Sequence, residues 1–443
     1  MGYAMSEAMR RDARAIWDAA VEAVRPEPLV RRALAEIADA IRSAPRIWVL
    51  GAGKAGAAMA AALEDALADR LDRIDGIVNV PADAVRPLRK IRLHAARPAA
   101  TNFPTQEGVA GAEAMLRLAR AAGPDDVALC LFSGGGSALL PAPAAGVTLA
   151  DKLAVTRLLH QCGATINVMT AVRKHLSAIK GGRLAQAFAG KALYSLIISD
   201  VVGDPLDVIA SGPTAPDPAT YADALAILER FNLLDRVPAA ARAHLERGQA
   251  GEFTESPKTL PAHVHNIVMG NNAVALRAAQ ARAEELGYRV LNLGSFIEGE
   301  TRHVAQVHAG IARSILEQGV PFAPPACVLS GGETIVTLGP NPGKGGRNQE
   351  FVLAAIQKLG PLPCAAKAVI LSGGTDGEDG PTNAAGAIAD AGTLTRAARL
   401  GLAPAEYLDR NDAYPFFEKT GDLLLTGLTQ TNVMDVRVVL MGK

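Results

Sequence analysis

Two glycine-rich segments of the chain have the composition of phosphate-binding loops. The first, Gly51-Ala-Gly-Lys-Ala-Gly56, follows the apolar run 47–50, and the second, Ser133-Gly-Gly-Gly-Ser137, follows the apolar run 127–132. Glycines at the end of a strand let backbone N–H groups approach a phosphate closely, and the helix that follows directs its positive end at the anion. We therefore predict phosphate binding by Gly51, Gly53, Ser133, Gly134, Gly135, Gly136 and Ser137.

The first segment also fits the Gly-x-Gly-x-x-Gly fingerprint of dinucleotide cofactors, which would make the protein an NAD(P)H-dependent reductase. That fingerprint expects an acidic residue at the end of the next strand, but the next apolar run ends in Val80-Pro81, and Asp83 lies beyond the proline. Lys54, inside the segment, instead places a positive charge where it could meet a phosphate or a carboxylate. A tight strand-to-helix turn, in which the glycines only permit close packing, is the alternative.

Further cationic side chains fall in two other segments. Residues 165–182 predict a helix that stops at Lys180-Gly-Gly182 and carries Arg173, Ser177 and Lys180 on one face. This face could bind substrate, with Lys180 at a phosphate, or it could be solvated, and the spacing does not decide between the two. Arg347 lies ahead of a helix that we expect to begin near Asn348, and its planar donor fork suits a carboxylate or a transferring phosphoryl group.

Carboxylates follow several of the apolar runs. Asp200 and Asp204 come after the run 194–198, and Asp376 comes after the run 368–371. Magnesium takes a few hard oxygen ligands and shares its other positions with phosphate and water, so acids at strand ends beside phosphate loops suit it. For Asp204, formation of a turn by the side chain is the alternative. We predict metal ligands at Asp200, Asp204 and Glu333, and phosphate contacts at Gly331 and Gly332.

These segments share a rhythm that predicts an α/β fold. A short apolar run ends in a glycine-, serine- or aspartate-rich loop, and a helical pattern follows. Unbroken apolar strands that alternate with helices are typical of a parallel sheet covered on both faces, and ligands bind beyond the carboxyl ends of such strands. The pattern occurs at 47–50, 127–132, 194–198, 267–269, 327–329, 368–371 and 423–425.

One stretch, 234–261, interrupts this rhythm with prolines and glycines among polar residues. Such composition is typical of a domain boundary. We therefore predict two α/β domains, over residues 1–240 and 241–443, with a ligand cleft between them.

The composition of the whole chain limits its partners. Lysine plus arginine and aspartate plus glutamate number 45 each, which argues against a nucleic acid or an anionic membrane as partner. The 443 residues contain no run of about 18 strongly apolar residues and no visible secretory signal, so we expect a cytoplasmic protein. The four cysteines are scattered, as is typical of reduced thiols. The sequence does not decide the oligomeric state, and a homodimer stays open.

Taken together, the loops resemble those of the class II glycerate kinases, a family with a carboxy-terminal MOFRL domain whose members are often labelled hydroxypyruvate reductase. The resemblance covers nearly the whole chain in order. It rests on Gly51-Ala-Gly-Lys-Ala55, Ser133–Pro141, Arg173-Lys-His-Leu-Ser177 with Lys180-Gly-Gly-Arg183, Ser199–Pro205 with Ala210-Ser-Gly-Pro-Thr214, Ser330-Gly-Gly-Glu-Thr334, Gly343–Glu350, Gly373-Gly-Thr-Asp-Gly377 and Thr426–Asn432.

This resemblance implies two Rossmann-like three-layer α/β/α domains and ATP-dependent, Mg²⁺-assisted phosphorylation of D-glycerate at its 2-hydroxyl. It places the essential lysine at Lys54, the essential arginine at Arg347 and acidic partners at Asp200 and Asp376. We expect Asp376 rather than Asp200 to orient or deprotonate the acceptor hydroxyl. The alternatives are an NAD(P)H-dependent hydroxypyruvate reductase, favoured by residues 51–56 and the family label, and a non-catalytic sugar-acid binding protein, which the acids at the strand ends argue against.

Overall fold

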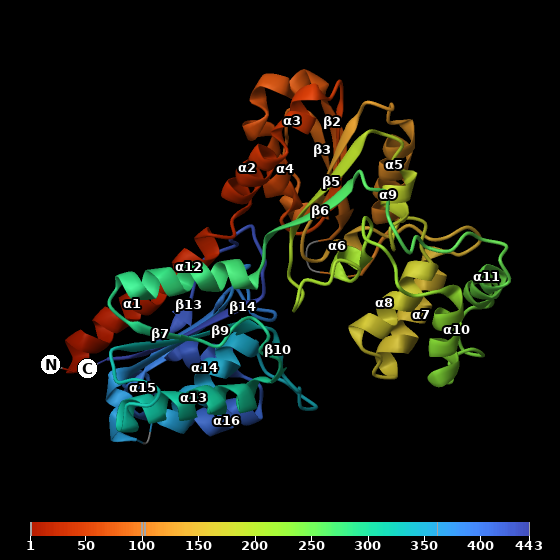
Figure 1. Ribbon diagram of the computed structural model, residues 1–443. Helices are drawn as coiled ribbons and strands as arrows, with labels where there is room; N and C mark the ends of the chain where they lie inside the picture. Colours follow the sequence, from red (N-terminus) through yellow and green to blue (C-terminus); the bar gives the residue numbers. More distant parts are fainter. Residues whose placement is uncertain (1, 99–100, 102, 361, 443) are drawn as a thin grey trace. The chain divides into compact units, whose positions relative to one another are not determined.

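The computed structural model describes residues 2–98, 101, 103–360 and 362–442. The chain forms two compact units, each with its own six-stranded sheet (Figure 1). We call Pro26–Met269 the continuous unit, and Met1–Arg25 together with Gly270–Lys443 the split unit.

This division differs from the predicted boundary between residues 240 and 241. The first helix, α1 (Gly2–Glu22), packs on the sheet of the split unit, where the buried indole of Trp17 donates to the Gly373 carbonyl at 3.2 Å. At the other boundary, β6 (Val264–Gly270) is the edge strand of the first sheet. The proline- and glycine-rich stretch 234–261 encloses α11 (Ala239–Gln249) and is therefore part of the continuous unit.

The sheet of the continuous unit has the order β3-β2-β1-β4-β5-β6, and its first five strands in chain order run parallel. Successive side chains of a strand point to opposite faces. Accordingly, Val78 and Val80 face α4 (Gly56–Ala66), whereas Asn79 faces α5 (Gln106–Ala121). The strands are β1 (Ile47–Ala52), β2 (Ile74–Pro81), β3 (Ile91–Arg97), β4 (Val127–Phe132), β5 (Ala192–Ile198) and β6.

Four helices of the continuous unit build a second core beside this sheet. Val155, Leu159, Val172 and Leu228 are among its fully buried members. Because this core is separate from the sheet, the loops that connect the two can carry polar side chains between them. The helices are α7 (Leu149–Gln161), α8 (Ile166–His175), α10 (Tyr221–Arg230) and α11.

The sheet of the split unit is mixed, which differs from the parallel sheet expected from the sequence. β14 (Asp435–Met441) runs antiparallel to both of its neighbours, and β12 (Gly386–Asp390) runs antiparallel to β11 (Ala368–Gly374). A loop without a helix joins β11 to β12, and strands joined without a crossover helix pair antiparallel. The order is β13-β12-β11-β14-β9-β7, with β13 (Leu423–Leu424), β9 (Ala326–Gly332) and β7 (Arg289–Asn292).

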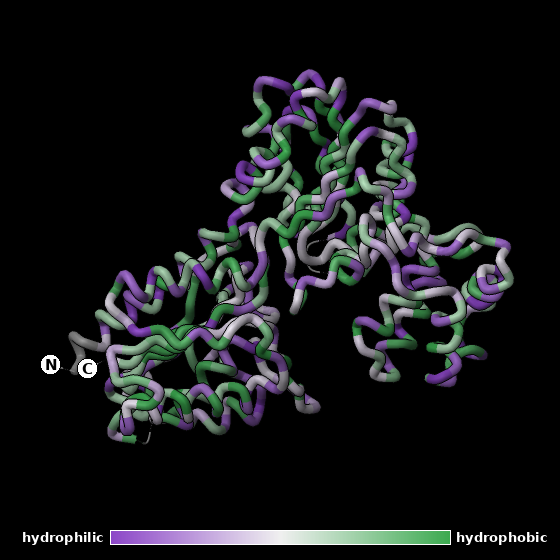
Figure 2. The backbone as a smooth tube through the Cα atoms, in the orientation of Figure 1, coloured by the Kyte–Doolittle hydropathy of each residue, from purple (hydrophilic) through white to green (hydrophobic). Residues whose placement is uncertain are grey.

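Helices cover both faces of this second sheet, which confirms the α/β class and the three-layer arrangement (Figure 1). α1 and α12 (Asn272–Glu285) lie on one face, and α13 (Thr301–Gln318) and α14 (Arg347–Leu359) lie on the other. Hydrophobic residues concentrate in the strands between them (Figure 2). None of the helices in the described ranges has the length and apolar character needed to cross a membrane.

The remaining elements are short. They are α2 (Pro26–Glu36), α3 (Ala38–Ser43), α6 (Gly136–Leu139), α9 (Arg183–Ala187), α15 (Ala391–Arg399), α16 (Pro404–Asp409), α17 (Ala413–Thr420), the paired β8 (Gly299–Glu300) and β10 (Thr334–Ile335), and short stretches of 3-10 helix at Ala68–Arg73, Ala82–Ala84, Ile209–Ser211 and Pro363–Lys367.

Candidate active site

The two predicted glycine segments lie side by side in the continuous unit, because each follows one of the adjacent parallel strands β1 and β4. The Lys54 amide donates to the Gly134 carbonyl at 2.8 Å. The Ala55 amide donates to Ser133 Oγ at 3.1 Å. The structure thus brings together the two segments that the sequence singles out, and the contact fixes the backbone that carries the exposed Lys54 side chain.

Gly51 and Gly53 serve close packing, which corrects the phosphate-binding role predicted for them. A Cβ atom on Gly51 would collide with the Leu131 carbonyl, and one on Gly53 would collide with Ser133 Oγ. Gly51 lies within the sheet between two strands, and the Gly53 amide donates to the Asn79 carbonyl at 3.2 Å. Their backbone groups are therefore occupied within the protein, and the alternative of a tight strand-to-helix turn describes this segment.

The second segment, Ser133–Ser137, turns into the short helix α6 beside two cationic side chains. Gly135 has a φ of 75°, in the left-handed region that favours glycine. Lys54 Cγ and Arg97 Nη2 lie 3.5 and 3.8 Å from the position that a Cβ atom on Gly135 would take. The predicted phosphate contacts at Gly134, Gly135, Gly136 and Ser137 therefore adjoin positive charge.

Arg173, Ser177 and Lys180 do not share a helix face, because α8 ends at His175 and the other two residues follow it. Arg173 and Lys180 nevertheless converge on one residue, Ser137. Arg173 Nη2 donates to Ser137 Oγ at 2.6 Å, and Lys180 Nζ donates to the Oγ and carbonyl oxygen of Ser137 at 2.9 and 2.8 Å. Lys180 is 1% exposed, so it is a buried cation and not part of a solvated face.

Asp200 and Asp204 lie in the turn after β5, and both side chains are partly exposed. Within the described residues, no three His, Cys, Asp or Glu side chains are grouped so that they could hold a metal ion. Mg²⁺ is commonly held by one or two carboxylates together with phosphate oxygens and water. These two carboxylates therefore suit Mg²⁺ as part of a complex with phosphate and do not form a closed site of their own.

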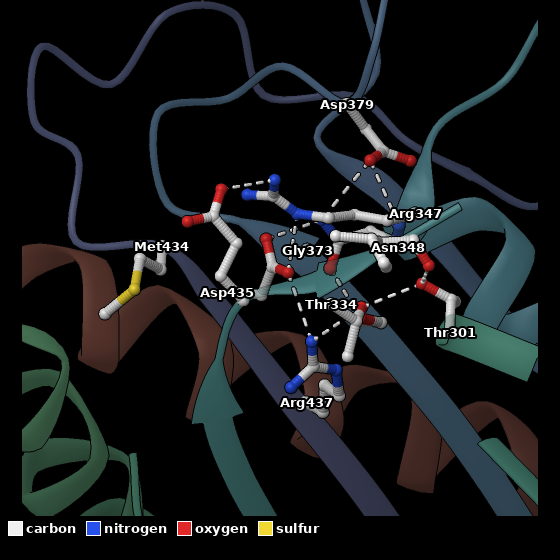
Figure 3. A network of polar contacts seen from close by, with 12 residues as sticks. Thr301, Thr334, Arg347, Asn348, Gly373, Asp379, Met434, Asp435 and Arg437 are labelled. Atoms are coloured by element: carbon white, nitrogen blue, oxygen red, sulfur yellow. Dashed lines mark hydrogen bonds and ion pairs between the residues drawn. The ribbon is translucent and has the colours of Figure 1, made fainter. Parts of the chain in front are cut away.

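In the split unit, Arg347 is the first residue of α14 and is held by two carboxylates (Figure 3). Its Nε donates to Asp435 Oδ2 at 2.8 Å, and its Nη1 donates to Glu333 Oε1 at 2.6 Å. Burial acts to lower the pKa of Arg347, but the charges of Asp435 and Glu333 outweigh burial and raise it. Glu333, predicted as a metal ligand, is thus a partner of Arg347 in this structure, and its binding of a metal stays a prediction.

Asp435 is the anchor of this arginine and was not predicted from the sequence. Its carboxylate is fully buried and also accepts from Asn348 Nδ2 at 2.8 Å and from Arg437 Nη2 at 3.1 Å. Arg437 is 1% exposed and donates further to Thr334 Oγ1 at 3.2 Å. The signal in the sequence is the pair of opposite charges inside the apolar strand 435–441, because buried charges are normally paired.

Asp379 fixes the start of the helix that carries Arg347. Its carboxylate accepts from the amides of Asn348 and Gln349 at 3.0 and 2.8 Å, which satisfies helix N–H groups that have no partner within the helix. Burial raises the pKa of Asp379 to about 7, against the lowering effect of these two hydrogen bonds. Asp379 therefore positions Arg347 through the backbone of α14.

The other predicted residues of the split unit lie in or beside the strand ends. The Gly331 amide donates to the Gly294 carbonyl at 2.9 Å, and a Cβ atom there would collide with Asn272. Gly332, with a φ of 102°, packs against Ile297, so both glycines are required by close contacts, and the phosphate role predicted for them stays a prediction. Asp376 lies in the turn after β11, where its Oδ1 accepts from the Glu378 amide at 3.2 Å.

Sequence comparison identifies relatives that match nearly the whole chain. A domain of unknown function, DUF4147, matches residues 12–246, and the MOFRL family matches residues 326–435. A glycerate 2-kinase from Pyrococcus horikoshii is 38% identical over 397 residues, covering 89% of this chain and 87% of the relative. The crystal structure of a glycerate kinase from Thermotoga maritima has a TM-score of 0.87 at 33% identity, covering 98% of this chain and all of that one. The chain belongs to the glycerate kinase family.

This assignment to the glycerate kinase family confirms the resemblance found in the motifs. The predicted association with the reductase label also recurs: a protein from Agrobacterium vitis named putative hydroxypyruvate reductase is 42% identical over 435 residues, covering 98% of this chain and 94% of that protein. Proteins that are similar to this chain over most of its length thus have names for two different activities, kinase and reductase. The chemistry of the site has to distinguish the two activities.

Proposed function

We propose that this member of the glycerate kinase family transfers the γ-phosphoryl group of ATP to the 2-hydroxyl of D-glycerate and produces 2-phosphoglycerate. The observation that carries the proposal is the match over almost the full chain to proteins named glycerate kinase, including one named glycerate 2-kinase. Loss of positive charge at Lys54 or Arg347 should then affect the chemical step, because phosphoryl transfer depends on positioning and on charge stabilisation.

Lys54 and Arg347 are the proposed cationic groups of the reaction. Lys54 is carried on a backbone that is hydrogen-bonded to the second glycine segment, and it packs over Gly135. Arg347 has a guanidinium that Asp435 and Glu333 hold in one orientation. We propose that these two groups bind the carboxylate of glycerate and the transferring phosphoryl group.

The aspartates have proposed roles in proton transfer and metal binding. Asp376 would accept the proton of the acceptor hydroxyl, while Asp200 and Asp204 would bind Mg²⁺ together with phosphate oxygens. When bound, Mg²⁺ would neutralise phosphate charge. We further propose that the enzyme acts in the cytoplasm on these small molecules, and that it could do so as a homodimer.

The reductase alternative receives no support from the first glycine segment. A nicotinamide site uses free backbone amides at this turn to bind a pyrophosphate. Here the amides of Gly53, Lys54 and Ala55 all donate to protein acceptors. The same segment is explained by packing of β1 against β4 and by positioning of Lys54.

Two assays test the proposal. The full chain is incubated with D-glycerate, ATP and Mg²⁺, and ADP is measured, with enolase added to a second sample to convert 2-phosphoglycerate into phosphoenolpyruvate. ADP release together with phosphoenolpyruvate supports a 2-kinase, whereas ADP release without it indicates the 3-phosphate product. Oxidation of NADH or NADPH by hydroxypyruvate, with no ADP release from glycerate, would replace the kinase with the reductase.

A further inference from the structure

Four cationic side chains of the continuous unit lie close enough to one another for their charges to interact. Arg173 and Lys180 contact Ser137 directly, as described above. Lys152, from α7, donates its Nζ to the Leu176 carbonyl at 2.8 Å, and Arg183, at the start of α9, donates to the Tyr221 hydroxyl at 3.3 Å. Across the described ranges of the chain, none of these four side chains contacts a carboxylate. Among the described residues, no direct ion pair therefore neutralises the positive charge of this group.

The neighbouring residue Lys174, unlike these four cations, does contact carboxylates. Lys174 follows Arg173 in α8 and is also buried, but its Nζ lies 2.7 Å from Asp217 Oδ1 and 3.2 Å from Asp207 Oδ2. Buried charges are normally paired, because an isolated charge loses much of its hydration energy. Of these two neighbouring cations, Lys174 is thus paired with acids, whereas Arg173 contacts the Ser137 hydroxyl.

The hydroxyl groups of Ser137 and Ser211 have two protons to donate, but the hydrogen bond between them uses only one. Ser137 Oγ accepts from Arg173 and Lys180, and it shares one hydrogen bond with Ser211 Oγ at 2.8 Å that either hydroxyl can donate. Ser211 Oγ also accepts from Lys180 at 3.3 Å, so one of the two hydroxyl protons has no acceptor among the described residues. Nη1 of Arg183 is likewise buried without an acceptor. A group of donors that lacks acceptors matches an anion with several oxygens.

The backbone that presents Ser211 is held in an unusual conformation. Ala210, Ser211 and Gly212 have φ values of 52°, 63° and 59°, so two residues with a Cβ atom occupy the left-handed region. Each such residue costs about 1–3 kcal/mol, and conformations of this kind persist mostly at binding and catalytic sites. The turn is pinned by hydrogen bonds from the Gly181 and Gly182 amides to the Ser211 and Gly212 carbonyls, next to Lys180.

The electrostatics of the lysines favour a negatively charged ligand beside them. Burial, with added repulsion from Arg173 and Arg183, lowers the pKa of Lys152 to about 7. Burial and the charges of Arg173 and Lys152 also lower the pKa of Lys180 well below its ordinary value. A bound anion would reverse both effects, because a nearby negative charge favours the protonated lysine.

We propose that Lys152, Arg173, Lys180 and Arg183, with the hydroxyls of Ser137 and Ser211, bind a polyphosphate chain. Four cations suit a ligand with several negative charges better than a single carboxylate. The identification of this chain as the triphosphate of the nucleotide rests on the proposed kinase function, but binding of a polyphosphate does not.

The test is calorimetric titration of the full chain with inorganic tripolyphosphate, without substrate. Lys152→Gln and Arg173→Gln should each weaken the affinity about tenfold or more, because each removes a charge-assisted contact. Arg157→Gln is the matched control, since Arg157 is exposed on the same helix α7 as Lys152 and should change the affinity less than about twofold. Equal affinities for the wild type and all three variants would overturn the proposal.

A further variant tests whether the fold is intact, and a kinetic measurement tests whether the cluster binds ATP or D-glycerate. Ser211→Ala removes only a hydroxyl, and its melting temperature reports whether the fold is intact. In the kinase assay, the cluster variants should raise the KM for ATP and leave the KM for D-glycerate unchanged. A selective rise in the KM for glycerate would overturn the proposal and assign the cluster to the acceptor. If tripolyphosphate binds as expected but no ADP forms, the kinase function fails and the polyphosphate site stands.

Discussion

The proposed functional cations of the two units differ in the groups that contact them. In the continuous unit, Arg173 and Lys180 contact the hydroxyl and carbonyl oxygens of Ser137 and no carboxylate in the part of the chain that the structure describes. In the split unit, Arg347 is held between the carboxylates of Asp435 and Glu333. The first arrangement leaves positive charge for a ligand to neutralise, and the second largely cancels the charge while fixing the direction of the donor groups.

This difference separates two tasks that cations perform in phosphoryl transfer. Holding a polyphosphate requires net positive charge, because each bound oxygen brings negative charge with it. Stabilising a transition state requires donors that already point where charge will develop and that need no reorganisation. The acids that bind Arg347 therefore indicate orientation, and the absence of a direct ion pair to Lys180 among the described residues indicates binding.

The largest expected effect is on the rate. Lys54→Met and Arg347→Met should each lower kcat by about 10³-fold or more, because a cation at a transferring phosphoryl group contributes about that much. Only Arg347→Met should also lower the melting temperature, since it removes two ion pairs, whereas Lys54 is exposed. Steady-state ADP release and thermal melts of both variants measure the two effects.

Lys191→Met provides the control for that comparison, because Lys191 is another exposed lysine of the continuous unit. It should leave kcat and the melting temperature unchanged. A Lys54→Met variant with wild-type kcat would remove Lys54 from the reaction, and a fall in its melting temperature as large as that of Arg347→Met would make Lys54 structural.

The second largest effect is expected on the free energy of unfolding, from a change at Asp435, the buried acid that binds Arg347. Asp435→Asn leaves Arg437 without its buried counter-ion, and breaking a buried pair in this way costs about 3–5 kcal/mol. The free energy of unfolding, measured in urea, should fall by that amount relative to Asp409→Asn, a change on the surface of the same unit. Equal stabilities of the two variants would show that Arg437 and Arg347 do not depend on Asp435.

Local patterns in the sequence predict the strands and loops well, because burial and turn chemistry act over a few residues. The run 127–132 coincides with β4, and the segments at Lys54 and Ser133 do meet. The contact of Lys180 with Ser137 was anticipated only as a shared role in phosphate binding, since the helix that was expected to carry Lys180 ends at His175.

The sequence does not show which residues far apart in the chain contact each other in the fold. Trp17 contacts Gly373, so the first helix belongs to the split unit although hundreds of residues separate the two. Asp435 reaches Arg347 from the start of β14 and Glu333 from the residue between β9 and β10, and nothing in the local pattern around Arg347 indicates either acid. Glu333 was therefore predicted to bind a metal when its carboxylate binds an arginine.

A smaller effect is expected from the pH dependence of Asp379. Because its pKa is raised from 3.8 to about 7 in the folded protein, the folded state binds this proton more tightly than the unfolded chain does. The group therefore favours folding most below the unfolded pKa, and this contribution is lost as the pH rises through the folded pKa. Between pH 4.5 and 8, the free energy of unfolding of the wild type should fall by about 3 kcal/mol more than that of Asp379→Asn.

The lost hydrogen-bond acceptor in Asp379→Asn does not disturb that comparison, because it shifts the stability of the variant by the same amount at every pH. Urea titrations of both proteins across the pH range give the difference directly. Parallel pH profiles would mean that Asp379 stays ionised in the fold, and the cap of α14 would then be a charged one.

The smallest effect is expected at Glu333, the more exposed of the two acids that hold Arg347. Its side chain is 43% exposed, and ion pairs of this kind contribute at most about 1 kcal/mol because water screens them. Glu333→Gln should therefore leave the free energy of unfolding within about 0.5 kcal/mol of the wild type, while an amide oxygen keeps one acceptor for Arg347. If Glu333 instead bound Mg²⁺, the same variant would shift the Mg²⁺ concentration needed for half-maximal ADP release. An unchanged magnesium dependence with a modestly lower kcat would assign Glu333 to orienting the arginine, as its contact with Nη1 indicates.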